Sequence, residues 1–166
     1  LYERIRAGLH AADPYAAAAA QHHLPTHLTP FVGREDEIAA LLTILSQPGM
    51  RLLTLLGVGG MGKTRLAVEL ARASLERYAD GIFFVALAPL SSADAIPAAI
   101  AHALGIATQA SDLQAAVLRF LRDKQMLLLL DNVEHLLDGV GLVAEIVQAA
   151  PQVQIIATSR ARLLIY

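Results

Sequence analysis

Short apolar segments and amphipathic segments alternate along most of this chain. The apolar segments have the length of buried strands, and they cover residues 51–56, 81–87, 126–130 and 153–158. Between them, apolar residues recur three and four positions apart, which is the period of a helix with one buried face. The last of these helices is expected over residues 135–150. This alternation predicts an α/β fold in which right-handed crossovers join parallel strands and helices cover both faces of the sheet.

The ends of the predicted helices carry recognisable signals. The helix after the first strand is expected to span residues 63–78, with Ala73 on its buried face. Asp94 is expected to cap the next helix. Ser111 and Gln114 have the spacing of a capping box, in which each side chain bonds the backbone N–H of the other residue.

Composition limits the classes of protein that fit. The 166 residues suffice for one domain of ordinary size. Hydrophobic residues make up 55% of the chain, yet the longest bulky run is residues 126–130, far short of the ~20 residues that a membrane helix needs. Lys and Arg number 13 and Asp and Glu number 15, so the net charge of -2 gives no electrostatic case for nucleic-acid contact by this segment. The absence of cysteine excludes disulfides and thiolate metal sites. We therefore expect a cytoplasmic protein with a buried apolar core and no membrane contact.

Residues 21–30 interrupt the pattern with three His, two Pro and two Thr, which predicts a linker. A metal site at His22, His23 and His27 is the alternative, but no carboxylate or cysteine completes such a ligand set. The chain begins at Leu1 rather than Met, so we expect it to be a piece of a longer protein.

A glycine-rich segment between the first strand and the helix that follows carries the clearest chemistry. Residues 57–64 read Gly-Val-Gly-Gly-Met-Gly-Lys-Thr and match the pattern G-x-x-x-x-G-K-[ST]. The glycines let the backbone turn with positive φ and bring N–H groups close to an anion, and the following helix points its N-terminus at that anion. Lys63 supplies a compact positive charge for the β- and γ-phosphates, and the Thr64 hydroxyl is the expected Mg²⁺ ligand. A chance Gly-rich turn is the alternative, but the flanking strand and helix are the context that the motif requires.

Two further strand ends complete the candidate site. Asp131 follows the third apolar run and is expected to hold Mg²⁺ through its water shell, the alternative being an ordinary Asp at a strand end. Arg160 follows the fourth run and is expected at the same edge of the sheet, where it can reach a γ-phosphate. No Asn-Lys-x-Asp element for guanine occurs in the sequence, which favours adenine. The candidate nucleotide-binding residues of the loop region are Gly57, Gly59, Gly60, Met61, Gly62, Lys63, Thr64 and Arg65.

Four motifs in this order resemble the nucleotide-binding domain of the STAND ATPases, close to the NB-ARC and AP-ATPase group found in large bacterial transcriptional regulators. They are Phe-Val-Gly-Arg-Glu at 31–35, the glycine-rich loop, Leu-Leu-Leu-Leu-Asp-Asn-Val-Glu-His at 127–135 and Ile-Ile-Ala-Thr-Ser-Arg at 155–160. The resemblance implies a P-loop NTPase three-layer sandwich with a mainly parallel sheet, truncated at its C-terminal end. It also implies two parts: residues 1–30 as the tail of a preceding helical domain plus the linker, and residues 31–166 as an incomplete nucleotide-binding domain.

The same resemblance implies a molecular switch. ADP holds such proteins closed, and exchange for ATP opens them and often drives self-association. Sensor and effector domains of the same longer chain are then the expected partners. The resemblance also assigns adenine to the backbone of Val32 and the side chain of Arg34, whereas a plain surface charge is the alternative for Arg34.

Hydrolysis is expected to be slow. Many relatives place a second acid after the Walker Asp, and Asn132 takes that place here. Glu134 is the nearest free carboxylate and the candidate base, the alternative being a solvated Glu at a helix start, where it suits the helix dipole. The candidate catalytic residues are Lys63, Asp131, Glu134 and Arg160.

Three other functions stay open at this point. The first is a nucleotide-binding module that never turns over, which Asn132 supports. The second is an AAA+-like motor or loader, which would need an arginine finger and a lid. A small-molecule P-loop kinase is less favoured, because no Arg-rich lid segment lies between the strands.

Overall fold

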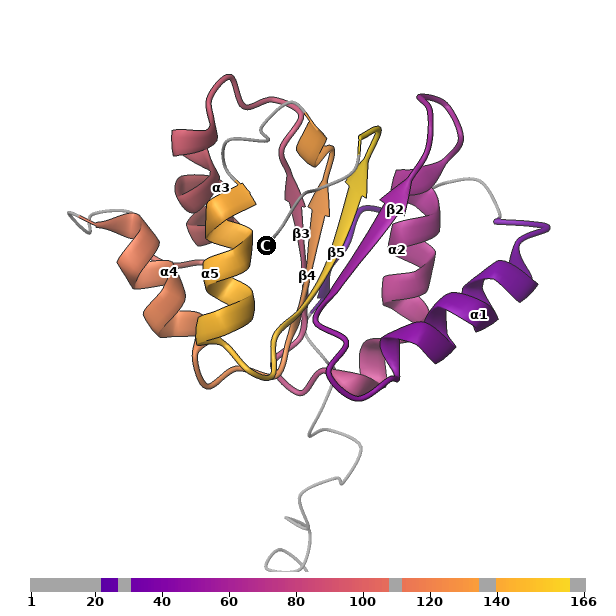
Figure 1. Cartoon of the computed structure of the whole chain (residues 1–166), viewed down its shortest axis with the longest axis horizontal. Helices are drawn as coiled ribbons and strands as arrows, with labels where there is room; N and C mark the ends of the chain where they lie inside the picture. Colours follow the sequence, from indigo (N-terminus) through magenta and orange to yellow (C-terminus); the bar gives the residue numbers. More distant parts are fainter. Residues whose placement is uncertain (1–21, 27–30, 108–111, 135–139, 162–166) are drawn as a thin grey trace, which may run out of the picture.

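The structure is a computed structural model, and it describes residues 22–26, 31–107, 112–134 and 140–161. These residues form a parallel sheet with a layer of helices on each face (Figure 1). The sheet has the order β1-β3-β4-β5-β2, and every neighbouring pair is parallel. The strands are β1 His22–His23, β2 Leu52–Leu56, β3 Ile82–Ala86, β4 Leu127–Asp131 and β5 Gln154–Ser159. The predicted α/β fold with a parallel sheet is confirmed.

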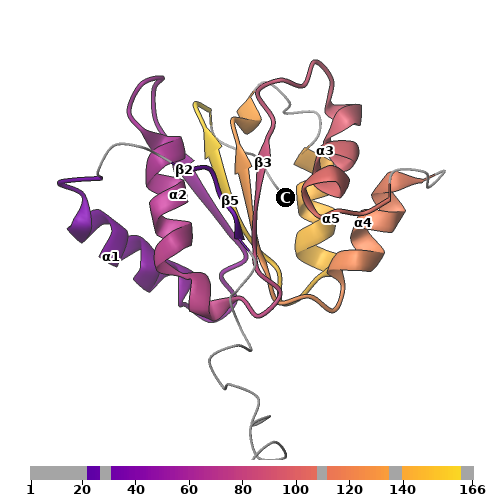
Figure 2. The ribbon, with the colours of Figure 1, turned by 180° about the vertical axis from the view of Figure 1, so that it is seen from behind.

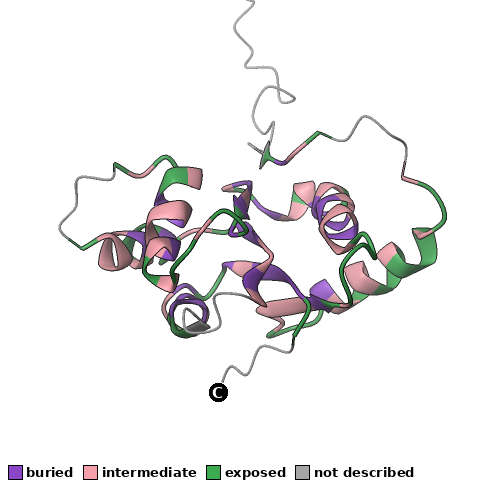
Figure 3. Ribbon diagram, turned by 90° about the horizontal axis from the view of Figure 1, so that it is seen from above, coloured by how far each residue is buried: buried purple, intermediate pink, exposed green. Residues whose placement is uncertain are grey.

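The helices divide between the two faces (Figures 1 and 2). On one face lie α1 Glu35–Leu45 and α2 Lys63–Ala73. On the other face lie α3 Ile96–Ala103, α4 Leu113–Leu121 and α5 Val140–Ala149. Seen from above, the sheet is buried between the two layers, and exposed residues gather on the outer surfaces and loops (Figure 3).

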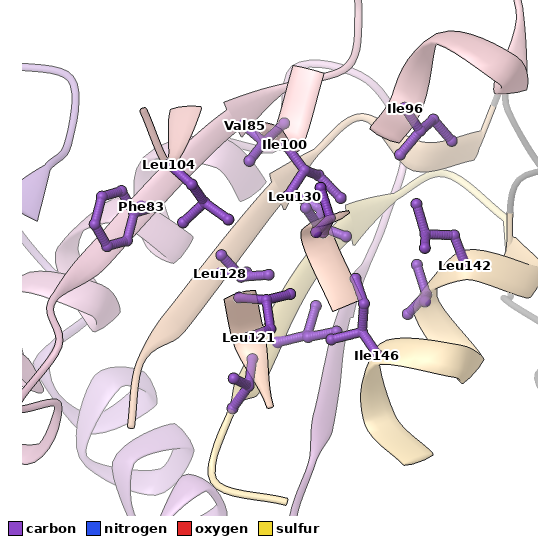
Figure 4. Close-up of a cluster of buried hydrophobic side chains, with 14 of the residues drawn as sticks. Phe83, Val85, Ile96, Ile100, Leu104, Leu121, Leu128, Leu130, Leu142 and Ile146 are labelled. Atoms are coloured by element: carbon purple, nitrogen blue, oxygen red, sulfur yellow. The ribbon is translucent and has the colours of Figure 1, made fainter. Parts of the chain in front are cut away.

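Strand β4 shows why the apolar runs in the sequence are continuous. Leu128 and Leu130 belong to the core beneath α3, α4 and α5, which Figure 4 shows in close-up. Leu127 and Leu129 belong to the core beneath α1 and α2. All four leucines are fully buried, because successive side chains of a strand point to opposite faces and both faces are covered.

Strand order brings together ends that are distant in the sequence. β5 comes last in the chain but lies between β2 and β4. Because all strands run in the same direction, the carboxyl ends of β2, β4 and β5 meet at one edge of the sheet. Ligands of open α/β sheets bind at such an edge.

The helix after β2 is shorter than predicted. It ends at Ala73, which is exposed rather than buried, and a 3₁₀ turn covers Leu75–Arg77. Ser74 is buried, and its hydroxyl donates to the carbonyl of Ala71 at 2.9 Å. This bond occupies a carbonyl of the last helical turn and accompanies the tighter turn.

The predicted helix caps are also displaced. A 3₁₀ turn, Ala93–Ala95, leads into α3, and its cap is Ser92, whose hydroxyl accepts from the N–H of Asp94, so Asp94 is not the cap. The cap of α4 is Asp112, which accepts from the N–H of Ala115 at 2.9 Å. Both caps have extended backbone, the conformation in which a side chain reaches back to the first turn. Ser111 lies outside the described residues, and Gln114 donates instead to Glu145.

Part of the predicted linker belongs to the sheet. His22–His23 pairs with Ile82 and Phe83 of β3, and the His23 ring stacks on Phe83 with centroids 5.3 Å apart. Leu24 is buried in the core beneath α2. The open edge of β3 offers unpaired backbone groups, which a short parallel segment satisfies. Residues 1–21, His27 and residues 135–139 lie outside the described residues. Within the described part of the chain, no helix combines the length and apolarity needed to cross a bilayer.

Candidate functional site

The glycine-rich loop joins β2 to α2 at the carboxyl edge of the sheet. Gly60 has φ 82° and Gly62 has φ 76°, in the left-handed region where a side chain would be strained. Gly62 is also the residue before the first turn of α2. The first N–H groups of α2 have no partner within the helix, so they are available to an anion at the loop.

Lys63 folds its side chain back onto the loop. Its Nζ donates to the carbonyl of Gly57 at 2.7 Å and to the carbonyl of Val58 at 3.1 Å. These carbonyls are neutral acceptors, whereas a phosphate oxygen is charged and makes a stronger hydrogen bond to an ammonium group. The side chain therefore lies within the loop that a phosphate would enter, and it can exchange its acceptors.

A network of hydroxyl groups surrounds Asp131 at the end of β4. Thr64 and Thr158 both donate to Oδ1 of Asp131, each at 2.6 Å. Thr158 also accepts a hydrogen bond of 2.9 Å from the N–H of Asn132. Asn132 has φ 69°, which Asn tolerates better than most residues, and the Thr158 hydroxyl holds its N–H in that conformation. The start of α2 and the ends of β4 and β5 are thus joined at one carboxylate oxygen.

The sequence analysis did not identify Thr158 as a site residue. Thr158 is buried, with 2% of its surface exposed, near the end of an apolar strand, so its residue type alone indicated packing. The pairing of Leu130 with Ala157 places the next residues of each strand, Asp131 and Thr158, side by side. Thr158 could therefore have been identified only from the register between β4 and β5, which cannot be read from the sequence.

Arg160 lies one residue beyond β5 and reaches both the loop and Glu134. Its Nε lies 3.1 Å from Oε1 of Glu134. A Cβ added to Gly59 would lie 3.4 Å from Cζ of Arg160, so the guanidinium lies against the middle of the loop. The N–H of Gly57 also donates to the carbonyl of Ser159 at 3.3 Å. The structure thus brings Arg160 to the phosphate loop and Glu134 to Arg160.

A small cavity of about 290 Å³ adjoins the loop on the α1 side. Its lining residues are Phe31, Val32, Arg34, Met61, Gly62 and Arg65. The Arg65 guanidinium lies 5.7 Å from the centre of the Phe31 ring, and Nε of Arg34 lies 3.3 Å from Glu37. Phe31 was not among the predicted site residues, because a single aromatic before a helix is commonly a core residue. Val32 and Arg34, which the family resemblance assigned to adenine, lie together at this cavity.

The charge of Glu35, at the start of α1, is stabilised by backbone N–H groups. Its own N–H and that of Gly33 hold the pKa of the carboxyl below its ordinary value. Glu35 therefore stays ionised at neutral pH. A larger cavity of about 920 Å³ lies between β3 and α3, and none of the candidate site residues lines it.

The strand–loop–helix, the Lys63 side chain in the loop and the Asp131 carboxylate beside Thr64 together define a P-loop nucleoside-triphosphate-binding domain. The family model of the NB-ARC domain matches residues 34–164, and the chain belongs to this family. The predicted family is confirmed, and NB-ARC domains bind nucleotide.

Two longer regulators are similar to the chain in sequence, and one solved structure is similar to it in fold. It is 46% identical over 112 residues to a "Putative HTH-type transcriptional regulator" of Mycobacterium tuberculosis, with 66% of this chain and 12% of that protein covered. It is 29% identical over 153 residues to the regulatory protein AfsR of Streptomyces griseus, with 85% of this chain and 15% of AfsR covered. The crystal structure of Cdc6p from Pyrobaculum aerophilum has the same fold, with a TM-score of 0.60, 20% identity, and 90% of this chain and 43% of that one covered. The chain thus spans only a small part of regulators that are much longer.

Proposed function

We propose that this domain binds ATP and ADP with Mg²⁺, hydrolyses ATP slowly, and acts as a nucleotide-dependent switch within a longer regulatory chain. The observation that carries the proposal is the 2.6 Å hydrogen bond between the Thr64 hydroxyl and Oδ1 of Asp131. It places two oxygen ligands of the kind that Mg²⁺ prefers beside a loop that can hold phosphates. A Mg²⁺ ion there would neutralise phosphate charge.

The phosphates would be held by the loop and the start of α2. The N–H groups of the loop and of the first helical turn bind the phosphate oxygens, and Lys63 transfers its ammonium group from the carbonyls of Gly57 and Val58 to them. Arg160 lies against Gly59, from where it can reach a terminal phosphate.

The base would enter the cavity between the loop and the start of α1. Phe31 and Arg65 offer flat surfaces for stacking, and the lining carries two arginines and no carboxylate. Guanine presents an N–H and an amino group that carboxylates commonly bind. This lining therefore supports adenine.

The switch role is supported by the family and by the length of the relatives. NB-ARC domains bind nucleotide, and the relatives are regulators of which this segment is a small fraction. Binding can shift the equilibrium between two states of such a chain only if ATP and ADP make different contacts in them. Arg160 is the described side chain best placed to make that difference, because it lies against the loop without being part of it.

A second candidate is a nucleotide-binding module that never turns over. Asn132 stands where a second acid would activate water, and Glu134 is engaged with Arg160. An amide can orient a water molecule but cannot take its proton at neutral pH. A steady release of phosphate from the wild-type protein would exclude this candidate.

The proposal is tested by calorimetry with ADP on the full-length protein and its Lys63→Ala variant. We expect the substitution to abolish or greatly weaken binding, because it removes the charge that faces the phosphates. Arg122→Ala is the control, since it removes one positive charge from an exposed position at the end of α4. Equal affinity of wild type and Lys63→Ala would overturn the assignment of the loop.

A further inference from the structure

Glu134 and Arg160 form an ion pair that is buried on one side only. The side chain of Glu134 is 14% exposed, whereas that of Arg160 is 64% exposed. The contact joins Oε1 of Glu134 to Nε of Arg160 at 3.1 Å. Glu134 is therefore fixed in the protein, and Arg160 is the member of the pair that can move.

The carboxylate of Glu134 has little else to stabilise it. Its Oε2 is buried, and the described residues supply no hydrogen-bond donor to it. A buried carboxylate without partners is costly, so Arg160 is the main compensation for its charge. If Arg160 moves away, the Glu134 carboxylate is left without a counter-charge. The energetic cost of that state opposes the movement.

The same guanidinium lies against the phosphate loop. A Cβ on Gly59 would lie 3.4 Å from Cζ and 3.5 Å from one terminal nitrogen of Arg160. An anion held by this loop would therefore lie close to the guanidinium. Glu134 and a terminal phosphate would therefore both draw on the charge of one guanidinium.

We propose that Glu134 is a positioning residue that withholds Arg160 from the nucleotide, so that it lowers the preference of the domain for ATP over ADP. This inference rests on the proposed nucleotide-binding function. The terminal phosphate of ATP must share the charge of Arg160 with Glu134, whereas ADP lacks that phosphate. Glu134 thus acts through Arg160 and not as the base that removes a proton from water.

The test compares dissociation constants for a non-hydrolysable ATP analogue and for ADP, measured by calorimetry on the full-length protein. Solvent around the exposed Arg160 screens the pair, so we expect Glu134→Gln to tighten binding of the ATP analogue relative to ADP by only about two- to fivefold. Glu145→Gln, which removes an exposed carboxylate from α5, is the matched control and should leave the ratio unchanged.

A second pair of variants asks whether the effect passes through Arg160. In an Arg160→Ala background, Glu134→Gln should no longer change the ratio, because the competing group is absent. A structural role for Glu134 would alter both affinities together and would not depend on Arg160. Unchanged ADP affinity in Glu134→Gln shows that the variant is folded.

Three results would overturn the inference. The first is a Glu134→Gln variant whose ratio of dissociation constants for the ATP analogue and ADP equals that of the wild-type protein. The second is a change in this ratio on Glu134→Gln that persists in the Arg160→Ala background. Either one would leave the proposed function standing if the wild-type protein binds ADP and Lys63→Ala does not. The third is wild-type protein that binds neither nucleotide, which would remove the proposed function and this inference together.

Discussion

The Thr64 hydroxyl donates a 2.6 Å hydrogen bond to Oδ1 of Asp131, although the two residues lie on different elements and are separated by 67 positions in the sequence. Thr64 belongs to the first turn of α2, and Asp131 ends β4. Because β5 lies between β2 and β4, the loop must reach across one strand to make this contact. The bond therefore depends on the whole sheet being correctly assembled.

In the Asp131→Asn variant, the affinity for ADP should no longer depend on Mg²⁺. The amide oxygen can still accept from both threonine hydroxyls, so we expect the fold to survive, but the neutral group binds a hard cation poorly. Calorimetry with ADP in the presence of Mg²⁺ and of a chelator measures the difference. The wild-type protein and the control Asp123→Asn, an exposed residue after α4, should bind more tightly with Mg²⁺. An undiminished Mg²⁺ effect in Asp131→Asn would show that the ion is held elsewhere.

Thr158→Val should destabilise the protein by about 1–3 kcal/mol, because it removes the Thr158 hydroxyl that the part-buried N–H of Asn132 bonds and takes one donor from Asp131. Chemical denaturation of the two proteins measures this. Thr158→Ser restores the hydroxyl and should recover most of the loss. Thr43→Val is the control, since the Thr43 hydroxyl bonds Ala39 at the exposed surface of α1 and should matter little. A fully stable Thr158→Val would mean that the hydroxyl contributes nothing to the carboxylate network.

ATP should bind more tightly than GTP, by roughly tenfold if one guanine donor pair is left unsatisfied. The reason is the cavity beside the loop, whose lining has two arginines and no carboxylate. Competition of each nucleotide against a labelled ATP analogue is the measurement. Arg34→Ala should weaken the binding of ATP while leaving the protein folded. Arg119→Ala, on the exposed surface of α4, is its control. If GTP competes as well as ATP, the assignment of Val32 and Arg34 to adenine binding is wrong.

Asn132→Asp should raise the slow rate of phosphate release, because a carboxylate can accept the proton of an attacking water and an amide cannot. The backbone of Asn132 has φ 69°, a conformation that Asp tolerates about as well as Asn, so the substitution tests chemistry rather than folding. A coupled phosphate-release assay at saturating ATP gives the rate. If Asn132→Asp and Glu134→Gln both turn over at the wild-type rate, hydrolysis is limited by something other than the acid at this strand end.

Local sequence patterns are enough to predict the class of fold and to identify the phosphate loop. Continuous apolar runs such as 126–130 are dictated by burial on two faces, and the order of glycines before Lys63 is dictated by backbone conformation. Both constraints are local, so they can be read without knowing what lies opposite. Asp131 was predicted on the same basis, as an acid directly after a buried strand.

Which residues meet at the site follows from the arrangement of the strands in the sheet. The role of Thr158 depends on the register of β5 against β4, and the pairing of Arg160 with Glu134 depends on β5 lying beside β4. The attachment of His22–His23 to the sheet depends on the open edge of β3. These contacts link positions far apart in the sequence and have no local signature, because a Thr in an apolar strand or a His in a Pro-containing segment has the same local pattern whatever it faces. The same holds for the end of α2 at Ala73 and for the caps Ser92 and Asp112. Each depends on which side chain can reach a free backbone group in three dimensions.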